Sequence, residues 1–325
     1  MDEKDILYVV VPCYNEEAVL PETTRQFKNK MTTLIETGRI SSQSKVMYVN
    51  DGSKDKTWEM IKSISEEDSL FTGISLSRNR GHQNALLAGL MTAKEYANVV
   101  ISMDADLQDD INAIDEMLDK YGAGADIVYA VRKNRKKDSF FKKWTAETFY
   151  KFMQKMGVNI VYNHADYRLT SKRVLDSLEE FKEVNLFLRG MFPLIGFRTD
   201  IVYYERKERN AGESKYPLKK MLHFAWDGIT SFSVQPIKMV RNFGVLLLTC
   251  SIIFFLYLVI NSIIENSFKI QEYILASIWF VAGIQTLSLG IIGEYVGKVY
   301  GEVKRRPRFI IQENLLVDGD KTNER

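Results

Sequence analysis

Acidic and amide side chains gather directly after a short apolar segment in the first third of the chain. Residues 99–103 read Val-Val-Ile-Ser-Met, and Asp104, Asp106 and Gln108 follow at alternate positions. A run of β-branched residues too short for a helix predicts a buried strand. Because side chains alternate along an extended chain, we expect Asp104 and Asp106 to point to the same side. Two carboxylates so placed suit a hard cation, Mg²⁺ or Mn²⁺, which completes its coordination with substrate phosphates and water.

The same acids have a simpler interpretation. Asp104 and Asp106 could lie in a solvated turn, with Asp110 at the start of the next helix, because Asp is favoured at that position. The two interpretations differ in whether other chemically active side chains meet these acids.

Apolar and helical segments alternate along the first part of the chain, and this alternation predicts an α/β fold with a mostly parallel sheet. The expected strands are 6–11, 45–50, 71–76, 99–103 and 126–130. Ligands of such sheets bind at the carboxyl ends of the strands. The side chains expected at those ends are Tyr14, Glu16, Asp51, Arg78, Asp104 and Asp106.

These strand ends favour a nucleotide held by acids and a metal. The chain has no Gly-x-Gly-x-x-Gly turn after its first strand and no Walker lysine loop, so ordinary dinucleotide binding and P-loop hydrolysis are not supported. Asp51 is able to accept a hydrogen bond from a uracil N–H or a ribose hydroxyl, although an aspartate before Gly52 is also typical of a turn. Arg132 directly follows the fifth strand and is expected to contact phosphate.

Two uncharged segments, 242–264 and 273–293, have the length of membrane spans, which need about 20 residues. Two buried core helices are the alternative. Lys and Arg are frequent before the first segment and after the second, whereas 265–272 holds two acids and one lysine. The positive-inside rule therefore predicts that both long ends lie in the cytoplasm.

The predicted organisation is a multi-pass protein of the cell membrane. Its parts are a cytoplasmic catalytic domain at 1–216, an interfacial helix at 217–241, spans at 242–264 and 273–293, an outside loop at 265–272 and a cytoplasmic tail at 294–325. The start of the chain is charged, so no cleavable signal sequence is expected. The chain has 44 Lys and Arg against 42 Asp and Glu, a balance that argues against general nucleic-acid binding.

Two basic segments have open interpretations. The charged loop 206–216, which includes Gly212 and Ser214, is able to bind an anion such as a lipid phosphate, or it is a positive-inside cluster. Residues 140–156 interleave lysines with aromatic side chains. They form either a helix on the membrane surface or a helix packed on the sheet with a solvated basic face.

Six short motifs follow one another in order along the chain. They are Val11–Glu17, Val49–Ser53, Ser77–Gly81, Met103–Asp109, Ala165–Leu169 and Arg209–Tyr216. Together they resemble the family-2 glycosyltransferases of the polyprenyl-phosphate type, which include dolichol-phosphate mannose synthase and bacterial undecaprenyl-phosphate glucosyltransferases. Prolines often follow Gln-Asp in that family, whereas this chain has Asp110 and Ile111.

The resemblance implies a GT-A type nucleotide-binding domain and an inverting glycosyltransferase. Such an enzyme moves a hexose, with glucose as the first expectation, from a UDP-sugar to undecaprenyl phosphate, and the lipid-linked sugar serves cell-envelope glycan modification. The cofactor is Mg²⁺ or Mn²⁺. Bacterial relatives also suggest a homo-oligomer formed through the membrane segments.

The resemblance also implies roles for individual residues. The metal ligands would be Asp104, Asp106 and Gln108. The nucleotide sugar would be held by Pro12, Tyr14, Glu16, Asp51, Arg78, Asp104 and Arg132. The acceptor phosphate would be held by Arg206, Arg209, Ser214 and Lys215. The catalytic residues would be Asp166, Asp106 and Arg168, with Asp166 either a base or a residue that orients Arg168 or the acceptor.

Other functions compete with this one. Mannose or an N-acetylhexosamine could replace glucose, because epimer selection depends on pocket shape. A processive polysaccharide synthase would carry a Gln-x-x-Arg-Trp motif, which is absent. A metal-dependent phosphohydrolase would use Asp104 as its nucleophile, and a membrane adaptor without catalytic activity would have no need of acids at the strand ends.

Overall fold

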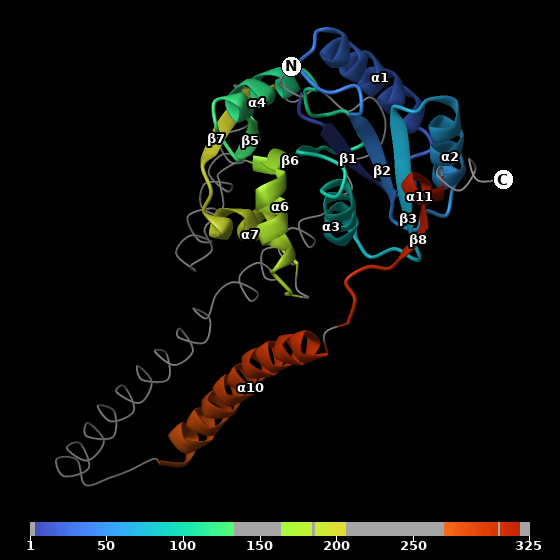
Figure 1. Cartoon of the computed structure of the whole chain (residues 1–325). Helices are drawn as coiled ribbons and strands as arrows, with labels where there is room; N and C mark the ends of the chain where they lie inside the picture. Colours follow the sequence, from blue (N-terminus) through green and yellow to red (C-terminus); the bar gives the residue numbers. More distant parts are fainter. Residues whose placement is uncertain (1–3, 133–163, 184–185, 206–269, 305, 319–325) are drawn as a thin grey trace. The chain divides into compact units, whose positions relative to one another are not determined.

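The computed structural model describes residues 4–132, 164–183, 186–205, 270–304 and 306–318 (Figure 1). The chain divides into two compact units. The first consists of residues 1–150, 160–215 and 306–325, and the second of 151–159 and 216–305. Residues 306–318, within the predicted tail 294–325, belong to the first unit, and the predicted domain boundaries stay predictions.

The first unit alternates strands and helices over most of its length. Its elements are β1 (Leu7–Cys13), α1 (Leu20–Glu36), β2 (Lys45–Asn50), α2 (Thr57–Glu67), β3 (Phe71–Leu76), α3 (His82–Ala93), β4 (Val99–Ser102), α4 (Ala113–Gly122), β5 (Ile127–Arg132), β6 (His164–Ser171), α6 (Lys172–Glu179), α7 (Leu188–Ile195), β7 (Thr199–Tyr204), β8 (Ile311–Asn314) and α11 (Leu315–Asp318). The described part of the second unit contains the helix α10 (Ile270–Val303).

The strands form one sheet in the order β7-β5-β6-β4-β1-β2-β3-β8. β1 pairs in parallel with β2 and β4, β2 with β3, and β5 with β7. β6 runs antiparallel between β4 and β5, and β8 runs antiparallel to β3. The predicted α/β fold with a mostly parallel sheet is confirmed. The carboxyl ends of β1 to β5 consequently meet at one edge, where ligands of such sheets bind.

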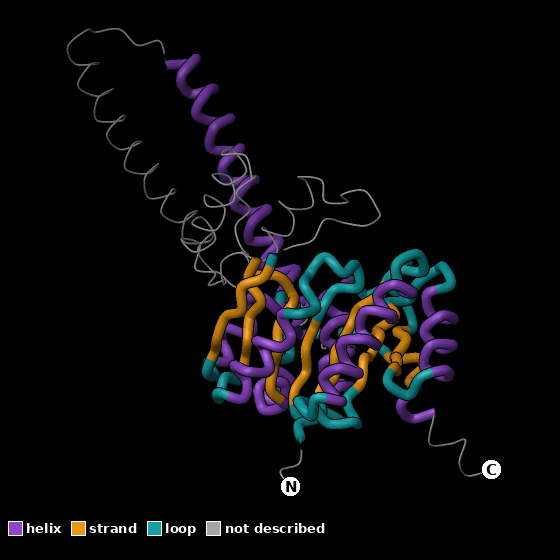
Figure 2. Tube along the Cα trace, turned by 90° about the horizontal axis from the view of Figure 1, so that it is seen from above, coloured by secondary structure: helices purple, strands orange, loops and turns teal. Residues whose placement is uncertain are grey.

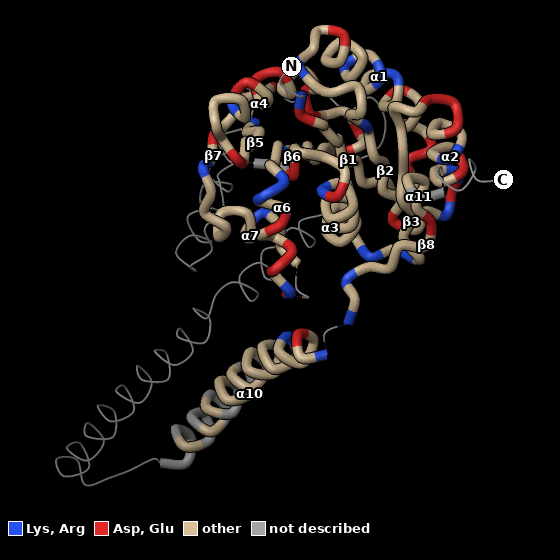
Figure 3. Tube along the Cα trace, viewed as in Figure 1, with Lys and Arg blue, Asp and Glu red and all other residues tan. Residues whose placement is uncertain are grey.

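Helices cover both faces of this sheet (Figures 1 and 2). On one face, Phe27 of α1, Trp58 of α2 and Met117 of α4 join Val9 and Tyr48 in a single buried cluster. On the other face, α3 packs against β1 and β2, and α6 packs against β6, α3 and α7. The strands β1, β3 and β4 carry no charged residue, and charges gather on the surrounding helices and loops (Figure 3).

The strand β6 was not among the five strands expected from the sequence. His164–Ser171 is a full strand, and α6 begins at Lys172. Tyr167 and Leu169 are buried, and Arg168 between them is fully buried as well. A strand covered on both faces normally reads as an apolar run. The charges within it concealed β6 from a pattern-based prediction.

The predicted membrane segments have different outcomes. Residues 206–269, which include the interfacial helix 217–241 and the span 242–264, lie outside the described residues. Residues 273–293 lie within α10. In the described part of the chain, no helix combines the length and the apolar character that crossing a membrane requires. Both spans therefore stay predictions.

Gly89 brings α3 close to the centre of the sheet. A Cβ atom at this position would lie 2.4 Å from Cγ1 of Val10 and 2.6 Å from Cγ2 of Val49. Both valines are fully buried in strands, so neither is able to move aside easily. The absence of a side chain at Gly89 thus sets how closely α3 packs on β1 and β2.

We expect Gly89→Ala to destabilise the protein by about 1–3 kcal/mol, the usual cost of overpacking a core. Thermal unfolding measures the effect as a lower melting temperature. Gly122→Ala is the matched control, because a Cβ at Gly122 has no atom within 4 Å. Equal melting temperatures for the two variants would contradict the close approach of α3.

Candidate active site

The loop after β1 is fixed to the loop after β2 by hydrogen bonds. The Asn15 N–H donates to Oγ of Ser53 at 3.0 Å, and the Lys54 N–H donates to Oδ1 of Asn15 at 2.8 Å. The Glu16 N–H donates to Oγ1 of Thr57 at 2.9 Å. These bonds hold the predicted nucleotide-binding residues of this loop, and the Tyr14 side chain beside them is exposed.

Asp51 holds the loop that follows β3. Its carboxylate accepts backbone N–H bonds from Arg80 at 2.7 Å and Gly81 at 2.9 Å. Burial raises the pKa of Asp51, and these two hydrogen bonds partly oppose the rise. The predicted acceptor for a uracil or ribose group is therefore buried and already bonded to this loop.

The close contact between the two loops also depends on Gly52. Its φ is +64°, and a Cβ there would lie 2.6 Å from the backbone carbon of Arg78 and from the backbone nitrogen of Asn79. Only glycine adopts this conformation readily in so little space. Arg78, another predicted nucleotide-binding residue, is exposed on this loop.

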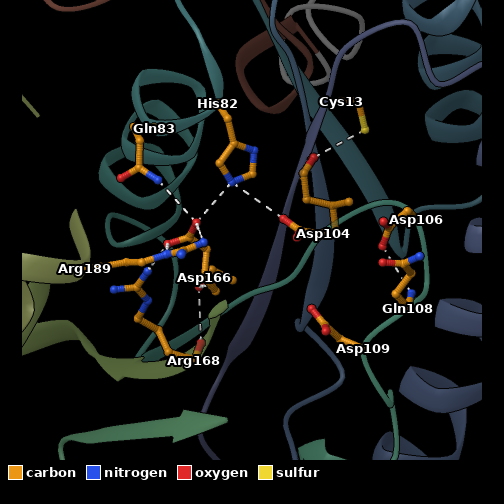
Figure 4. A network of polar contacts seen from close by, with 12 residues as sticks. Cys13, His82, Gln83, Asp104, Asp106, Gln108, Asp109, Asp166, Arg168 and Arg189 are labelled. Atoms are coloured by element: carbon orange, nitrogen blue, oxygen red, sulfur yellow. Dashed lines mark hydrogen bonds and ion pairs between the residues drawn. The ribbon is translucent and has the colours of Figure 1, made fainter. Parts of the chain in front are cut away.

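Asp166 of β6 lies at the centre of a polar network (Figure 4). Its Oδ1 accepts from Nη2 of Arg168 at 2.6 Å and from Nε of Arg189 at 3.2 Å. Its Oδ2 accepts from Nη2 of Arg189 at 3.0 Å and from Nε2 of Gln83 at 3.2 Å. Burial alone would raise the pKa of Asp166, but Arg189, His82 and Arg168 outweigh it and hold the pKa well below its usual range. The carboxylate is therefore ionised at neutral pH.

Arg168, predicted as a catalytic residue, is 0% exposed. Its guanidinium carbon lies 4.3 Å from the centre of the Phe192 ring, and its Nη2 pairs with Oδ1 of Asp166. A fully buried side chain does not reach a substrate. The contact that the structure shows for Arg168 is its pair with Asp166, and the catalytic roles predicted for both residues stay predictions.

His82, the first residue of α3, lies between Asp104, a predicted metal ligand, and Asp166, a predicted catalytic residue (Figure 4). Its Nε2 is 3.6 Å from Oδ1 of Asp104 and 3.5 Å from Oδ2 of Asp166. Burial lowers the pKa of His82, but its hydrogen bond to Asp166 and the two negative charges outweigh this and raise it to about 9. Sequence spacing did not indicate His82, Gln83 or Arg189. The position of His82 just after a strand end was the available signal.

The side-chain alternation from which Asp104 and Asp106 were predicted to point to the same side does not apply to them. β4 ends at Ser102, so both acids lie in a loop, where Leu107 has a φ of +52°. The Asp104 carboxylate faces His82, whereas Asp106 lies beside Gln108 (Figure 4). The backbone N–H of Gln108 donates to Oδ1 of Asp106 at 3.1 Å. Within the described residues, no three His, Cys, Asp or Glu side chains are grouped so that they could hold a metal.

The charge of this loop nevertheless fits a cation. Burial raises the pKa of Asp104, and the negative charges of Asp109, Asp166 and Asp106 raise it further. His82 acts in the opposite direction and lowers it. Carboxylate and amide oxygens are the donors that Mg²⁺ and Mn²⁺ prefer, and Mg²⁺ is usually bound by one or two carboxylates together with substrate phosphates. The donor chemistry of Asp104, Asp106 and Gln108 is therefore suitable.

The predicted phosphate ligand Arg132 takes part in another network. Its Nη2 donates to Oδ1 of Asp109 at 3.2 Å, and its Nε donates to the hydroxyl oxygen of Tyr204 at 3.0 Å. The Tyr204 hydroxyl in turn donates to Asp109. Arg132 thereby links the acidic loop to the ends of β5 and β7. Pro12 is buried in β1 opposite Val49 of β2.

The predicted acceptor residues cannot be placed in this network, because they lie outside the described residues. They are Arg206, Arg209, Ser214 and Lys215. The basic segment 140–156 lies outside them as well. The structure thus brings together Asp104, Asp166 and Arg168 from the predicted set.

The chain thus has a GT-A-like α/β fold with a mostly parallel sheet and with acidic side chains at the carboxyl ends of its strands. The profile of Glycosyl transferase family 2 matches residues 8–178, so the chain belongs to this family and is a glycosyltransferase. Membership of this family excludes the phosphohydrolase and the adaptor as alternatives.

Relatives resemble the chain over nearly its whole length. The glycosyltransferase YkoT of Bacillus subtilis is 49% identical over 95% of this chain and 92% of its own. The SfII prophage-derived bactoprenol glucosyl transferase of Shigella flexneri is 37% identical over 94% of this chain and 97% of its own. A solved structure, the glucosyl-3-phosphoglycerate synthase of Mycobacterium tuberculosis, covers 70% of this chain and 78% of its own at 15% identity and a TM-score of 0.45.

The raised pKa of His82 predicts how stability depends on pH when metal is removed with EDTA. A folded-state pKa of about 9 lies above the usual value of 6.5, so protonated His82 stabilises the fold below pH 6.5, and this stabilisation is lost as the pH rises through 9. The melting temperature should therefore fall more steeply over this range in the parent protein than in His82→Gln. Parallel curves for the two proteins would contradict the charge pairing.

Proposed function

We propose that this enzyme transfers glucose from UDP-glucose to a polyprenyl phosphate, undecaprenyl phosphate in a bacterium, with inversion at the anomeric carbon. The observation that carries this proposal is the 37% identity to a bactoprenol glucosyl transferase over 94% of the chain. The acids at the strand ends support the same donor chemistry. The product would be a lipid-linked glucose for cell-envelope glycan modification.

Asp104, Asp106 and Gln108 would hold a divalent cation, Mg²⁺ or Mn²⁺. When bound, the cation neutralises the diphosphate of the donor and so lowers the cost of its departure. The loop that carries Tyr14 and Glu16, fixed by Ser53 and Thr57, would bind the nucleotide.

Asp166 would orient the reacting groups. A phosphate monoester has a second pKa of about 6, so the acceptor is largely ionised at neutral pH and hardly needs a base. The low pKa of Asp166 also makes it a weak proton acceptor. Its contacts with Arg168, Arg189 and Gln83 instead support a fixed carboxylate that keeps His82 and the acceptor side of the site in place.

The acceptor would approach from the inner leaflet of the cell membrane. Arg206, Arg209, Ser214 and Lys215 would bind its phosphate, and the spans at 242–264 and 273–293 would keep the cytoplasmic catalytic domain beside the bilayer. This arrangement would confine the search for a lipid headgroup to a surface. Association of several copies through the membrane segments would complete the assembly.

A transfer assay tests the proposal. Membranes containing the protein are incubated with undecaprenyl phosphate, Mg²⁺ or Mn²⁺ and a panel of labelled sugar nucleotides. We expect a chloroform-soluble labelled product and free UDP, with UDP-glucose as the best donor. If an N-acetylhexosamine or mannose donor is preferred, the proposed lipid acceptor stands and the proposed sugar is wrong. If no donor gives a lipid product, the proposal is refuted.

Asp106→Asn should lower turnover about a hundredfold, because a bound cation supplies several kcal/mol to the transition state and about 1.4 kcal/mol corresponds to a factor of ten. Turnover measured over a range of Mn²⁺ concentrations checks this. Asp110→Asn, in the same loop, serves as the control and should retain parental activity. Equal turnover of the two variants would remove Asp106 from the metal site.

Asp166→Asn separates the two roles of this carboxylate. If Asp166 orients the site, turnover should fall about tenfold or more. This factor should be the same at every pH from 6 to 9, because the geometry of the site does not depend on the ionisation of the acceptor. If Asp166 removes the last proton of the acceptor, the deficit should disappear above about pH 7.5, where the phosphate has already lost that proton. The pH profile of turnover decides between them.

A further inference from the structure

We propose that the C-terminal strand β8 is a positioning element for the donor-binding loop 77–81. β8 pairs antiparallel with β3, with Ile74 opposite Asn314 and Leu76 opposite Ile311. The next residue, Ser77, donates its N–H to the carbonyl oxygen of Ile310 at 3.0 Å. Pairing with the C-terminal segment therefore continues from the strand into the first residue of the loop. Figure 1 shows β8 beside β3 at the edge of the sheet.

The position of this pairing on β3 is informative. β3 runs from Phe71 to Leu76, and its pairs with β8 begin at Ile74, in the half next to the candidate site. A strand that served only to cover the sheet edge would have no reason to prefer this half. An irregularity in the pairing between Ser75 and Leu76 lies at the same end.

A side-chain anchor holds β8 in place. Trp58 of α2 donates its indole N–H to Oε1 of Glu313 at 3.0 Å, and Nζ of Lys62 lies 3.8 Å from Oε2 of the same carboxylate. Leu315, just after β8, packs against the core cluster of the sheet. Glu313 thus adds a side-chain anchor to the backbone pairing of the C-terminal segment.

The loop held by β8 makes contacts that matter for the donor site. Its Arg80 and Gly81 N–H groups are the two donors to Asp51, and its backbone presses against Gly52. It is followed by His82, which faces Asp104 and Asp166. A displacement of β8 would therefore reach both the nucleotide-binding loop and the acids of the site.

β3 is held at this end from two sides. On the β2 side, Nδ2 of Asn50 donates to Oγ of Ser75 at 2.9 Å. On the other side stand the pairs with β8 and the bond from Ser77 to Ile310. Loss of β8 would leave one lateral support where the structure has two. The residues of β8, which are far from the catalytic motifs in the sequence, would then influence the affinity for the donor. This inference rests on the proposed function, because it takes the donor to be UDP-glucose.

Glu313→Ala in the full chain tests this inference by kinetics. We expect the KM for UDP-glucose to rise about tenfold, while kcat and the KM for undecaprenyl phosphate change less than twofold. Lys28→Gln is the matched control: it removes an ion pair of 2.7 Å to Asp68, just before the opposite end of β3. This control should keep the parental KM for UDP-glucose. A KM for UDP-glucose within twofold of the parent in Glu313→Ala would overturn the proposal, as would a fall in kcat that matches the loss of folded protein.

Hydrogen exchange gives a readout that does not depend on turnover. In Glu313→Ala, the amides of Ser77, Arg80 and Gly81 should exchange about tenfold faster, whereas those of β1 and β2 keep their parental rates. Unchanged exchange at all three amides would refute the positioning role. Faster exchange without any binding of UDP-glucose would support the role of β8 and instead contradict the proposed donor.

Discussion

A buried ion pair between Asp166 and Arg168 is the interaction on which the candidate site depends. Neither charge is tolerable in the protein interior without a partner, and removing one partner of such a pair costs about 3–5 kcal/mol. Asp166 is further bonded by Arg189 of α7 and Gln83 of α3. One carboxylate therefore fixes three elements that are distant in the sequence, and the geometry of the site follows from its need for charge compensation.

The acids near this pair create a second constraint. Asp109, Asp166 and Asp106 lie close enough to Asp104 for their charges to raise its pKa. The protein offsets part of this repulsion with His82, which faces both Asp104 and Asp166, and with Arg132, which bonds Asp109. A site that concentrates negative charge in this way is suited to a cationic ligand. The hydrogen bond from Gln108 to Asp106 is the kind of local contact that orders such a loop before the ligand arrives.

Local sequence patterns were sufficient for the first five strands and for the acids that follow them, because a strand of this kind is a short apolar run with a polar end. They were insufficient for β6, in which Asp166 and Arg168 neutralise each other and interrupt the apolar pattern. They were also insufficient for His82 and Arg189, since neither has an acid at a characteristic spacing. The partners of these residues are brought near by the fold, which no local pattern records.

The same limit explains the C-terminal segment. Four residues, Ile311–Asn314, are too few to predict a strand with certainty, and their sequence contains a glutamate and a glutamine. They form a strand because they pair with the edge of β3, which lies in a distant part of the sequence. The carboxylate of Glu313, which looks like a surface charge in the sequence, is in fact a partner of Trp58.

The placement of β6 determines the order in which the sheet is able to assemble. Among the described strands, β5 pairs only with β6 and β7, although it precedes both in the chain. During synthesis, β1 to β4 are able to join as soon as they leave the ribosome, whereas β5 has no neighbour until residues 164–171 emerge. The outer edge of β3 waits longer still, because its partner β8, residues 311–314, follows β7 much later in the chain. An unpaired edge of this kind is open to association with other chains, so the newly made protein is exposed to misassembly at β3 until residues 311–314 have emerged.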